Sequence, residues 1–171
     1  MVWLRDGVGM VGEGGWTVTL TGERRLPRLA ALWREIAAGH AGVLTAFVSS
    51  VFDDRSRAAT VLRIPHRLQR RTEAGADEIT QSLDEDRLRA AVQRAPGARL
   101  DGDIHPPPGA TLSPAGYERA VREALARIAA GDVAKVVLSL DEFIPADDAT
   151  CRGALAHLSD HYPGCWTFAV G

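Results

Sequence analysis

Apolar and polar residues alternate over parts of the chain in a way that is typical of β-strands. Residues 16–21 (WTVTLT) are alternating and β-branched and follow a glycine-rich stretch, so residues 2–21 are expected to form two strands around a glycine turn. Residues 42–53 and 59–71 are also strand-like and flank a DDRS turn, which predicts an antiparallel hairpin. A further short strand is expected at residues 78–80.

Helical spacing marks three other segments. A helix over residues 26–38, stopped by Gly39, is predicted because apolar residues recur at three- and four-residue intervals, namely Leu29, Leu32, Trp33 and Ile36. A second helix is expected over residues 83–95, before Pro96. A third begins at Ser113-Pro114, a favourable pair for the cap and first position, and ends at Gly131-Asp132.

The last part of the chain predicts a short buried strand at 134–140 (AKVVLSL), a helix over 151–161 and a strand at 165–170 (CWTFAV). Hairpins and helices in this order favour the α+β class, with antiparallel hairpins and packed helices, over an alternating parallel sheet. The sequence ends at Gly171, in or just after the apolar strand, whose backbone groups require a neighbour. We therefore expect a truncated domain whose last strand offers an edge for association.

Residues 94–116 contain five prolines and four glycines and predict a linker. The expected organisation is a β-rich subdomain over residues 1–95, a linker over 96–112, and the start of a second domain over 113–171.

Composition narrows the class of protein. The chain has 171 residues and a net charge of −2, so no general attraction to nucleic acid or to a membrane surface is expected. The two cysteines, Cys151 and Cys165, form no CxxC pair, and no apolar run approaches 18 residues. These features predict a reduced, cytoplasmic protein.

Two short motifs suggest chemistry but have simpler explanations. Residues 7–12 spell G-x-G-x-x-G, yet a strand follows them instead of the helix that a dinucleotide site needs, so a glycine-punctuated hairpin is expected. His157 and His161 share one face of a predicted helix, but no third ligand is evident, so a surface pair is expected rather than a metal site.

Lys135 is the main catalytic candidate. It begins an apolar segment, and a lysine drawn into apolar surroundings has a lowered pKa and can serve as a general base. The alternative is a strand-edge lysine whose ammonium group reaches water. The residues alone leave both interpretations open.

Several stretches resemble the chorismate-utilising enzymes, in particular bacterial isochorismate synthases. They are AVREALARIAAGDVAKVVLS at 120–139, LSDHYPGCWTFAV at 158–170, TAFVSSVFDDRSRAATVLRIPHRLQRR at 45–71 and VGMVGEGG at 8–15, the last followed by a helix carrying Trp33. The resemblance covers nearly the whole chain and implies the N-terminal part of the fold of that family.

The resemblance implies a role for Lys135 as the base that activates water for attack at C2 of chorismate. A glutamate further along protonates the departing C4 hydroxyl, and Mg²⁺ holds the substrate carboxylate. The product is isochorismate, which feeds siderophore, salicylate or menaquinone synthesis. Relatives that use ammonia typically lack this lysine, so a water-using isochorismate or salicylate synthase is favoured.

The sequence also departs from the family. The resemblance implies that the glutamates that supply the acid and the magnesium ligands lie in a C-terminal half, and we expect that half to be absent from this sequence. Leu140 stands where an arginine is common, and AFVSS, with Val48, replaces AFGSF. The chain is therefore expected to be inactive alone, and a non-catalytic remnant or binding module is the alternative.

Overall fold

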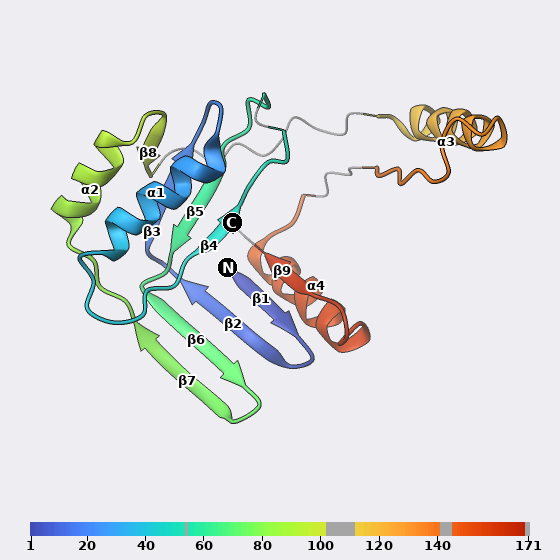
Figure 1. Cartoon of the computed structure of the whole chain (residues 1–171). Helices are drawn as coiled ribbons and strands as arrows, with labels where there is room; N and C mark the ends of the chain where they lie inside the picture. Colours follow the sequence, from blue (N-terminus) through green and yellow to red (C-terminus); the bar gives the residue numbers. More distant parts are fainter. Residues whose placement is uncertain (54, 102–111, 141–144, 170–171) are drawn as a thin grey trace. The chain divides into compact units, whose positions relative to one another are not determined.

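The computed structural model describes residues 1–53, 55–101, 112–140 and 145–169, and it is a mixed α+β structure (Figure 1). The described residues form four helices and two antiparallel sheets. The chain divides into two compact units: Met1–His105 together with Asp148–Gly171, and Pro106–Asp147. The division differs from the one expected from the sequence because the last strand returns to the first unit. No helix in the described part of the chain is both long and apolar enough to cross a bilayer.

The larger sheet has the strand order β7-β6-β2-β1-β9. Its strands are β1 (Val2–Arg5), β2 (Val8–Glu13), β6 (Arg67–Thr72), β7 (Gly75–Thr80) and β9 (Thr167–Ala169). The strands β1 and β2 form a hairpin at Asp6-Gly7, where both residues have positive φ. The G-x-G-x-x-G stretch therefore lies in a turn and a strand, as expected for hairpin glycines.

The smaller sheet has the order β4-β5-β3-β8. It consists of β3 (Trp16–Leu20), β4 (Phe47–Ser49), β5 (Thr60–Ile64) and β8 (Ala98–Leu100). Trp16, Val18 and Leu20 share one face of β3, because successive side chains of a strand alternate between faces. On this face they pack with residues of β5 and of two helices to form the main core.

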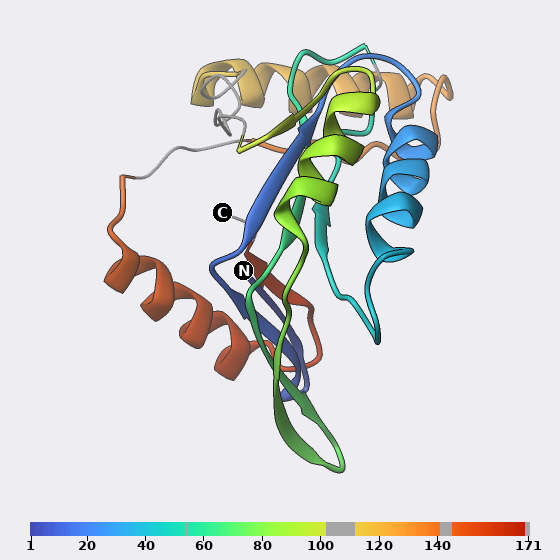
Figure 2. The ribbon, with the colours of Figure 1, turned by 90° about the vertical axis from the view of Figure 1, so that its left-hand side faces the viewer.

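The helices α1 (Arg25–Ala37) and α2 (Glu85–Arg94) pack on this face of the smaller sheet (Figure 2). Leu29, Leu32 and Ile36 form the buried stripe of α1, and Asp84 caps α2 by accepting a hydrogen bond from the Arg87 backbone N–H at 3.1 Å. Both helices lie within two residues of the predicted bounds. Outside this core, α4 (Asp148–His161) contacts β9 and has no fully buried residue.

The second unit contains α3 (Pro114–Ala129). The Ser113 hydroxyl accepts a hydrogen bond from the backbone N–H of Gly116 at 3.2 Å, and Gly131, with φ of 81°, follows the last turn. These two signals confirm the predicted start and end of this helix.

The structure corrects the expected strands at five places. The predicted two strands over residues 2–21 are three, of which β3 joins the smaller sheet. The predicted strand over 59–71 is two strands, β5 and β6, which belong to different sheets. Pro65, which has no N–H for a ladder, lies where the chain passes from one sheet to the other. Residues 98–100 of the predicted linker form β8, residues 102–111 of it lie outside the described part of the chain, and the segment 134–140 forms no strand.

The predicted strand over 42–53 is reduced to the three residues of β4. Gln81 explains its late start, because this buried side chain binds the backbone of Thr45 in the place of a neighbouring strand. The Thr45 N–H donates to Gln81 Oε1 at 2.6 Å, and Gln81 Nε2 donates to the Thr45 carbonyl at 3.0 Å. A third bond, from Gln81 Nε2 to the Pro65 carbonyl at 2.8 Å, fixes the amide.

Candidate functional site

Lys135 is exposed to solvent and lies in the second unit, a few residues after α3. Its neighbours are also open: 39% of Val136 and 82% of Val137 are accessible. The buried strand expected around this lysine is therefore wrong. The described residues of its own unit do not supply the apolar surroundings on which its use as a base depended.

The two histidines of α4 contact each other. The rings of His157 and His161 stack with their centroids 3.9 Å apart, and His161 Nδ1 lies 2.9 Å from the His157 carbonyl oxygen. Over residues 1–53, 55–101, 112–140 and 145–169, no three His, Cys, Asp or Glu side chains come together as a metal site would require.

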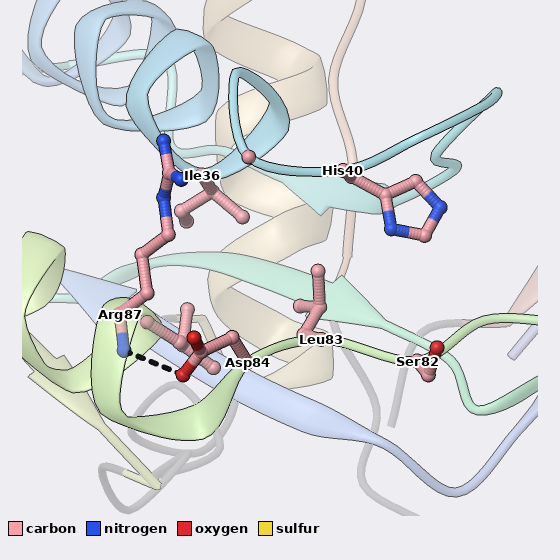
Figure 3. Close-up of a pocket in the computed structure, with 8 residues that line it drawn as sticks. Ile36, His40, Ser82, Leu83, Asp84 and Arg87 are labelled. Carbon is pink, nitrogen blue, oxygen red and sulfur yellow. Dashed lines mark hydrogen bonds between the residues drawn. The ribbon is translucent and has the colours of Figure 1, made fainter.

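A small pocket with both polar and apolar walls lies between the end of α1 and the start of α2 (Figure 3). Arg87 reaches from α2 toward Gly39, and His40, Ser82 and Asp84 also line the space. Its volume is about 30 Å³, which holds about one or two water molecules. The pocket is therefore too small for an organic substrate.

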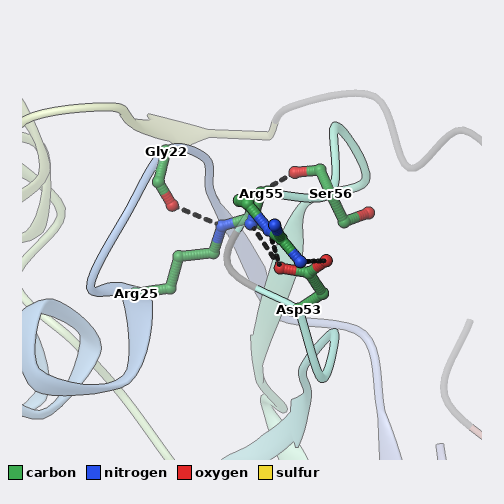
Figure 4. Close-up of polar contacts among 5 residues, drawn as sticks. All are labelled: Gly22, Arg25, Asp53, Arg55 and Ser56. Carbon is green, nitrogen blue, oxygen red and sulfur yellow. Dashed lines mark hydrogen bonds and ion pairs between the residues drawn. The ribbon is translucent and has the colours of Figure 1, made fainter.

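Arg25 is the largest fully buried side chain, with 1% of its surface exposed. Its guanidinium binds three backbone carbonyls: Nε donates to Gly22 at 2.6 Å, Nη1 to Ala58 at 2.5 Å, and Nη2 to Ser56 (Figure 4). These bonds tie the loop before β5 to the first turn of α1, so Arg25 acts in the fold and is not free to bind a ligand.

The same loop carries an ion pair between Asp53 and Arg55, with Arg55 Nε 3.1 Å from Asp53 Oδ1. Hydrogen bonds from the Arg55 side chain and backbone, together with the more distant charge of Arg25, hold the pKa of the Asp53 carboxyl below its ordinary value. Asp53 is exposed and already paired within its turn, which agrees with a local structural role.

An apolar groove of about 530 Å³ lies between α1 and β4. We call it the β4 groove; its walls include Leu26, Ala30 and Trp33 of α1 and Leu44, Ala46 and Val48 beside or within β4. All of its lining residues are uncharged, and the only polar side-chain groups among them are the Thr45 hydroxyl and the Trp33 indole N–H. The size and lining are those of a binding surface, and it offers no acid or base for chemistry.

An aromatic cluster lies at the β9 edge of the larger sheet. The ring centroids of Trp3 and Trp166 are 5.5 Å apart, those of Trp3 and Phe168 are 5.6 Å apart, and the Arg5 guanidinium lies 5.7 Å from the Trp166 ring. More than half of Phe168 is exposed. The cluster is an apolar surface beside a sheet edge.

Comparisons of the chain with protein-family models, with the curated proteins and with solved structures found no match. The functional assignment therefore depends on the residues and the geometry described above.

Sequence reasoning missed Arg25 and the β4 groove. The spacing of Arg25 contained a signal, because residues 25, 29, 32 and 36 form one continuous stripe of α1, and an arginine in a core stripe needs buried acceptors. The groove gave a weaker signal: Leu26, Ala30 and Trp33 form a second apolar stripe beside the first.

Proposed function

We propose that this chain carries the N-terminal part of a chorismate-utilising enzyme of the isochorismate synthase type. The observation that carries the proposal is the segment AVREALARIAAGDVAKVVLS, in which a capped helix ends at Gly131-Asp132 and leads directly to Lys135. The α+β class with antiparallel sheets supports it at a coarser level. The fine detail of the family fold stays part of the proposal.

In the proposed reaction, Lys135 accepts a proton from a water molecule while the water oxygen forms a bond to C2 of chorismate. The ring double bond shifts and the C4 hydroxyl leaves with a proton from an acid, so one water enters and one departs. A lysine serves as such a base only when its ammonium group loses hydration. Because Lys135 is exposed, the proposal requires a further surface that covers it.

Magnesium is part of the proposed chemistry because it neutralises the substrate carboxylate. The described residues do not fit such a site, since no group of three possible ligands lies together among them. No described residue is therefore assigned to hold the metal. The same holds for the acid, to which no described residue is assigned.

The test uses a form of the protein that converts chorismate with Mg²⁺, either extended or supplied with a second chain. Lys135→Ala is expected to abolish water addition in that form, while circular dichroism and the unfolding midpoint of the 171-residue chain, in which the side chain is exposed, stay unchanged. Arg127→Ala, on the exposed face of α3, is the matched control and keeps activity. Retained turnover in Lys135→Ala would remove this residue from its role.

Product analysis decides between the two water-using enzymes, because salicylate synthase also eliminates pyruvate. Isochorismate without pyruvate supports the first choice, with siderophore, salicylate or menaquinone synthesis in the cytoplasm as its setting. Salicylate together with pyruvate supports the alternative.

A non-catalytic binding module is the second candidate, and two observations favour it. Lys135 lies in solvent, and the β4 groove contains no titratable side chain. If extended and complemented forms of the protein all fail to convert chorismate, the binding module is established over the enzyme.

Association through the β9 edge is also proposed. Among the described residues, β9 pairs only with β1, and its aromatic side chain Phe168 is open to solvent. Phe168→Lys is expected to lower any self-association seen by light scattering, whereas Thr72→Lys, in β6 of the same sheet, leaves it unchanged.

A further inference from the structure

One row of apolar side chains crosses the smaller sheet and stops at β4. Leu100, Val18, Leu62 and Val48 are paired in register from β8 through β3 and β5 to β4. Directly opposed residues point to the same face, and here they face α1 and α2. Val18 and Leu62 are each 1% exposed, but Val48 is 44% exposed. The row thus lacks a further apolar side chain, on a strand beside β4, that would bury Val48.

Helix α1 extends over this missing position. Its buried stripe packs on β3 and β5, while a second apolar stripe of Leu26, Ala30 and Trp33 faces the β4 groove. Leu26 is 58% exposed, although a helix in a two-layer fold normally buries its apolar stripes on a sheet. The helix therefore provides an apolar cover one strand wider than the sheet below it.

The backbone of β4 defines what fits there. Among the described residues, β4 pairs with β5 alone, so the N–H and C=O groups of its other edge are available to a strand. By contrast β7, an edge strand of the larger sheet, is protected by charge: Asp77 and Glu78 pair with arginines of β6. The edge of β4 has no such protection, since residues 42–52 contain no charged side chain.

Charge at the rim distinguishes between possible occupants. Arg34 is exposed, lies one turn beyond Ala30, and donates from Nε to the Ala30 carbonyl at 3.2 Å. The guanidinium therefore lies beside the backbone of Ala30, one of the residues that line the uncharged groove. A second copy of the chain would bring another uncharged β4 and another Arg34, so it does not complement this rim.

We infer that the β4 edge binds one extended strand of a different polypeptide, whose alternate side chains are apolar and enter the β4 groove, and which carries a carboxylate near Arg34. The strand hydrogen-bonds to β4, and one of its apolar side chains extends the row beyond Val48. This inference concerns the first unit alone and does not depend on Lys135 or on chorismate.

The test is a titration of the full ¹⁵N-labelled chain with a blocked ten-residue peptide of alternating Val and Thr with one Glu. The control peptide has the same composition with its valines grouped together. The alternating peptide is expected to slow amide exchange at residues 47–49 and to leave β7 unchanged. Binding of both peptides with equal affinity, or of neither at millimolar concentration, would overturn the inference.

Variants locate the site. Val48→Lys is expected to weaken binding at least tenfold, whereas Ser49→Lys, on the next residue but the opposite face, changes it less than threefold. Both side chains are exposed, so both variants keep the fold. Arg34→Glu is expected to weaken binding of the Glu peptide and not of its Gln counterpart. Equal effects of Val48→Lys and Ser49→Lys would contradict the site.

Sedimentation of the unbound chain tests the rival occupant. We expect the unbound chain to show no concentration-dependent dimer whose formation depends on Val48, as Val48→Lys would reveal. Such a dimer would show that a second copy fills the groove, and it would overturn the choice of a different polypeptide.

Discussion

Replacing Arg25 with methionine tests how strongly one buried guanidinium holds the first unit together. Methionine keeps an unbranched side chain and a good helix propensity, so Arg25→Met mainly removes the charged donors. The carbonyls of Gly22, Ser56 and Ala58 then lose their partner in a region that water does not freely reach.

The size of the effect follows from these contacts. A hydrogen bond to a charged group contributes about 1.5–3 kcal/mol, and three such bonds to one group are not additive. Leaving a buried acceptor without a partner costs about 1–3 kcal/mol, so losing all three bonds is expected to cost about 3–5 kcal/mol after allowing for non-additivity. Against a total stability of about 5–15 kcal/mol, this is a large fraction. For a chain of this size, each kcal/mol of lost stability lowers the thermal unfolding midpoint by about 2–4 °C, so this midpoint is expected to fall by about 6–20 °C.

The assay is urea unfolding followed by far-ultraviolet circular dichroism, with a thermal scan as a second readout. Arg34→Met, on the exposed side of the same helix, is the matched control and is expected to change stability by less than about 0.5 kcal/mol. A loss below about 1 kcal/mol for Arg25→Met would contradict the reasoning, because the three carbonyls would then be satisfied without the arginine.

Three further predictions concern the sheets. Gly15→Ala is expected to destabilise the fold far more than Gly7→Ala, although both glycines have positive φ. A Cβ at Gly15 would lie 1.9 Å from a β5 carbonyl oxygen, whereas a Cβ at Gly7 would have no atom within 4 Å. Equal unfolding midpoints of the two variants would contradict this. Gln81→Met is expected to cost about 2–4 kcal/mol and to raise amide exchange in the segment before β4, because three hydrogen bonds are lost; unchanged exchange would contradict it. Hydrogen bonds from β6 arginines hold the pKa values of Asp77 and Glu78 below their ordinary values, so their stabilisation is present above the unfolded-state pKa and is lost as pH falls through the lowered folded-state value. NMR of the β6–β7 hairpin should show loosening in acid and in high salt, and a hairpin equally ordered at every pH would refute the role of these pairs.

Local sequence signals were sufficient for the helices. The stripe beginning at Leu29 predicted α1, and Ser113 and Gly131 predicted both ends of α3. In each case the determining contacts lie within a few residues along the chain, which is where periodicity and capping operate.

The strands depended on contacts that are distant in sequence. Gln81 binds the backbone 36 residues earlier and delays β4, and the passage of the chain at Pro65 sends β6 into the other sheet. The pattern at 134–140 is apolar enough for a strand, yet a strand also needs a partner, and no described segment supplies one. The β4 groove likewise arises only when α1 and the sheet edge meet.

The central claim is that an exposed Lys135 needs a further surface to act as a base. Its most direct test is an assay of isochorismate formation by the purified chain and by its Lys135→Ala variant, each incubated with chorismate and Mg²⁺. We predict no product from either protein above the uncatalysed rate. Product formed by the chain and lost in Lys135→Ala would contradict it, because the described residues would then be sufficient for the reaction.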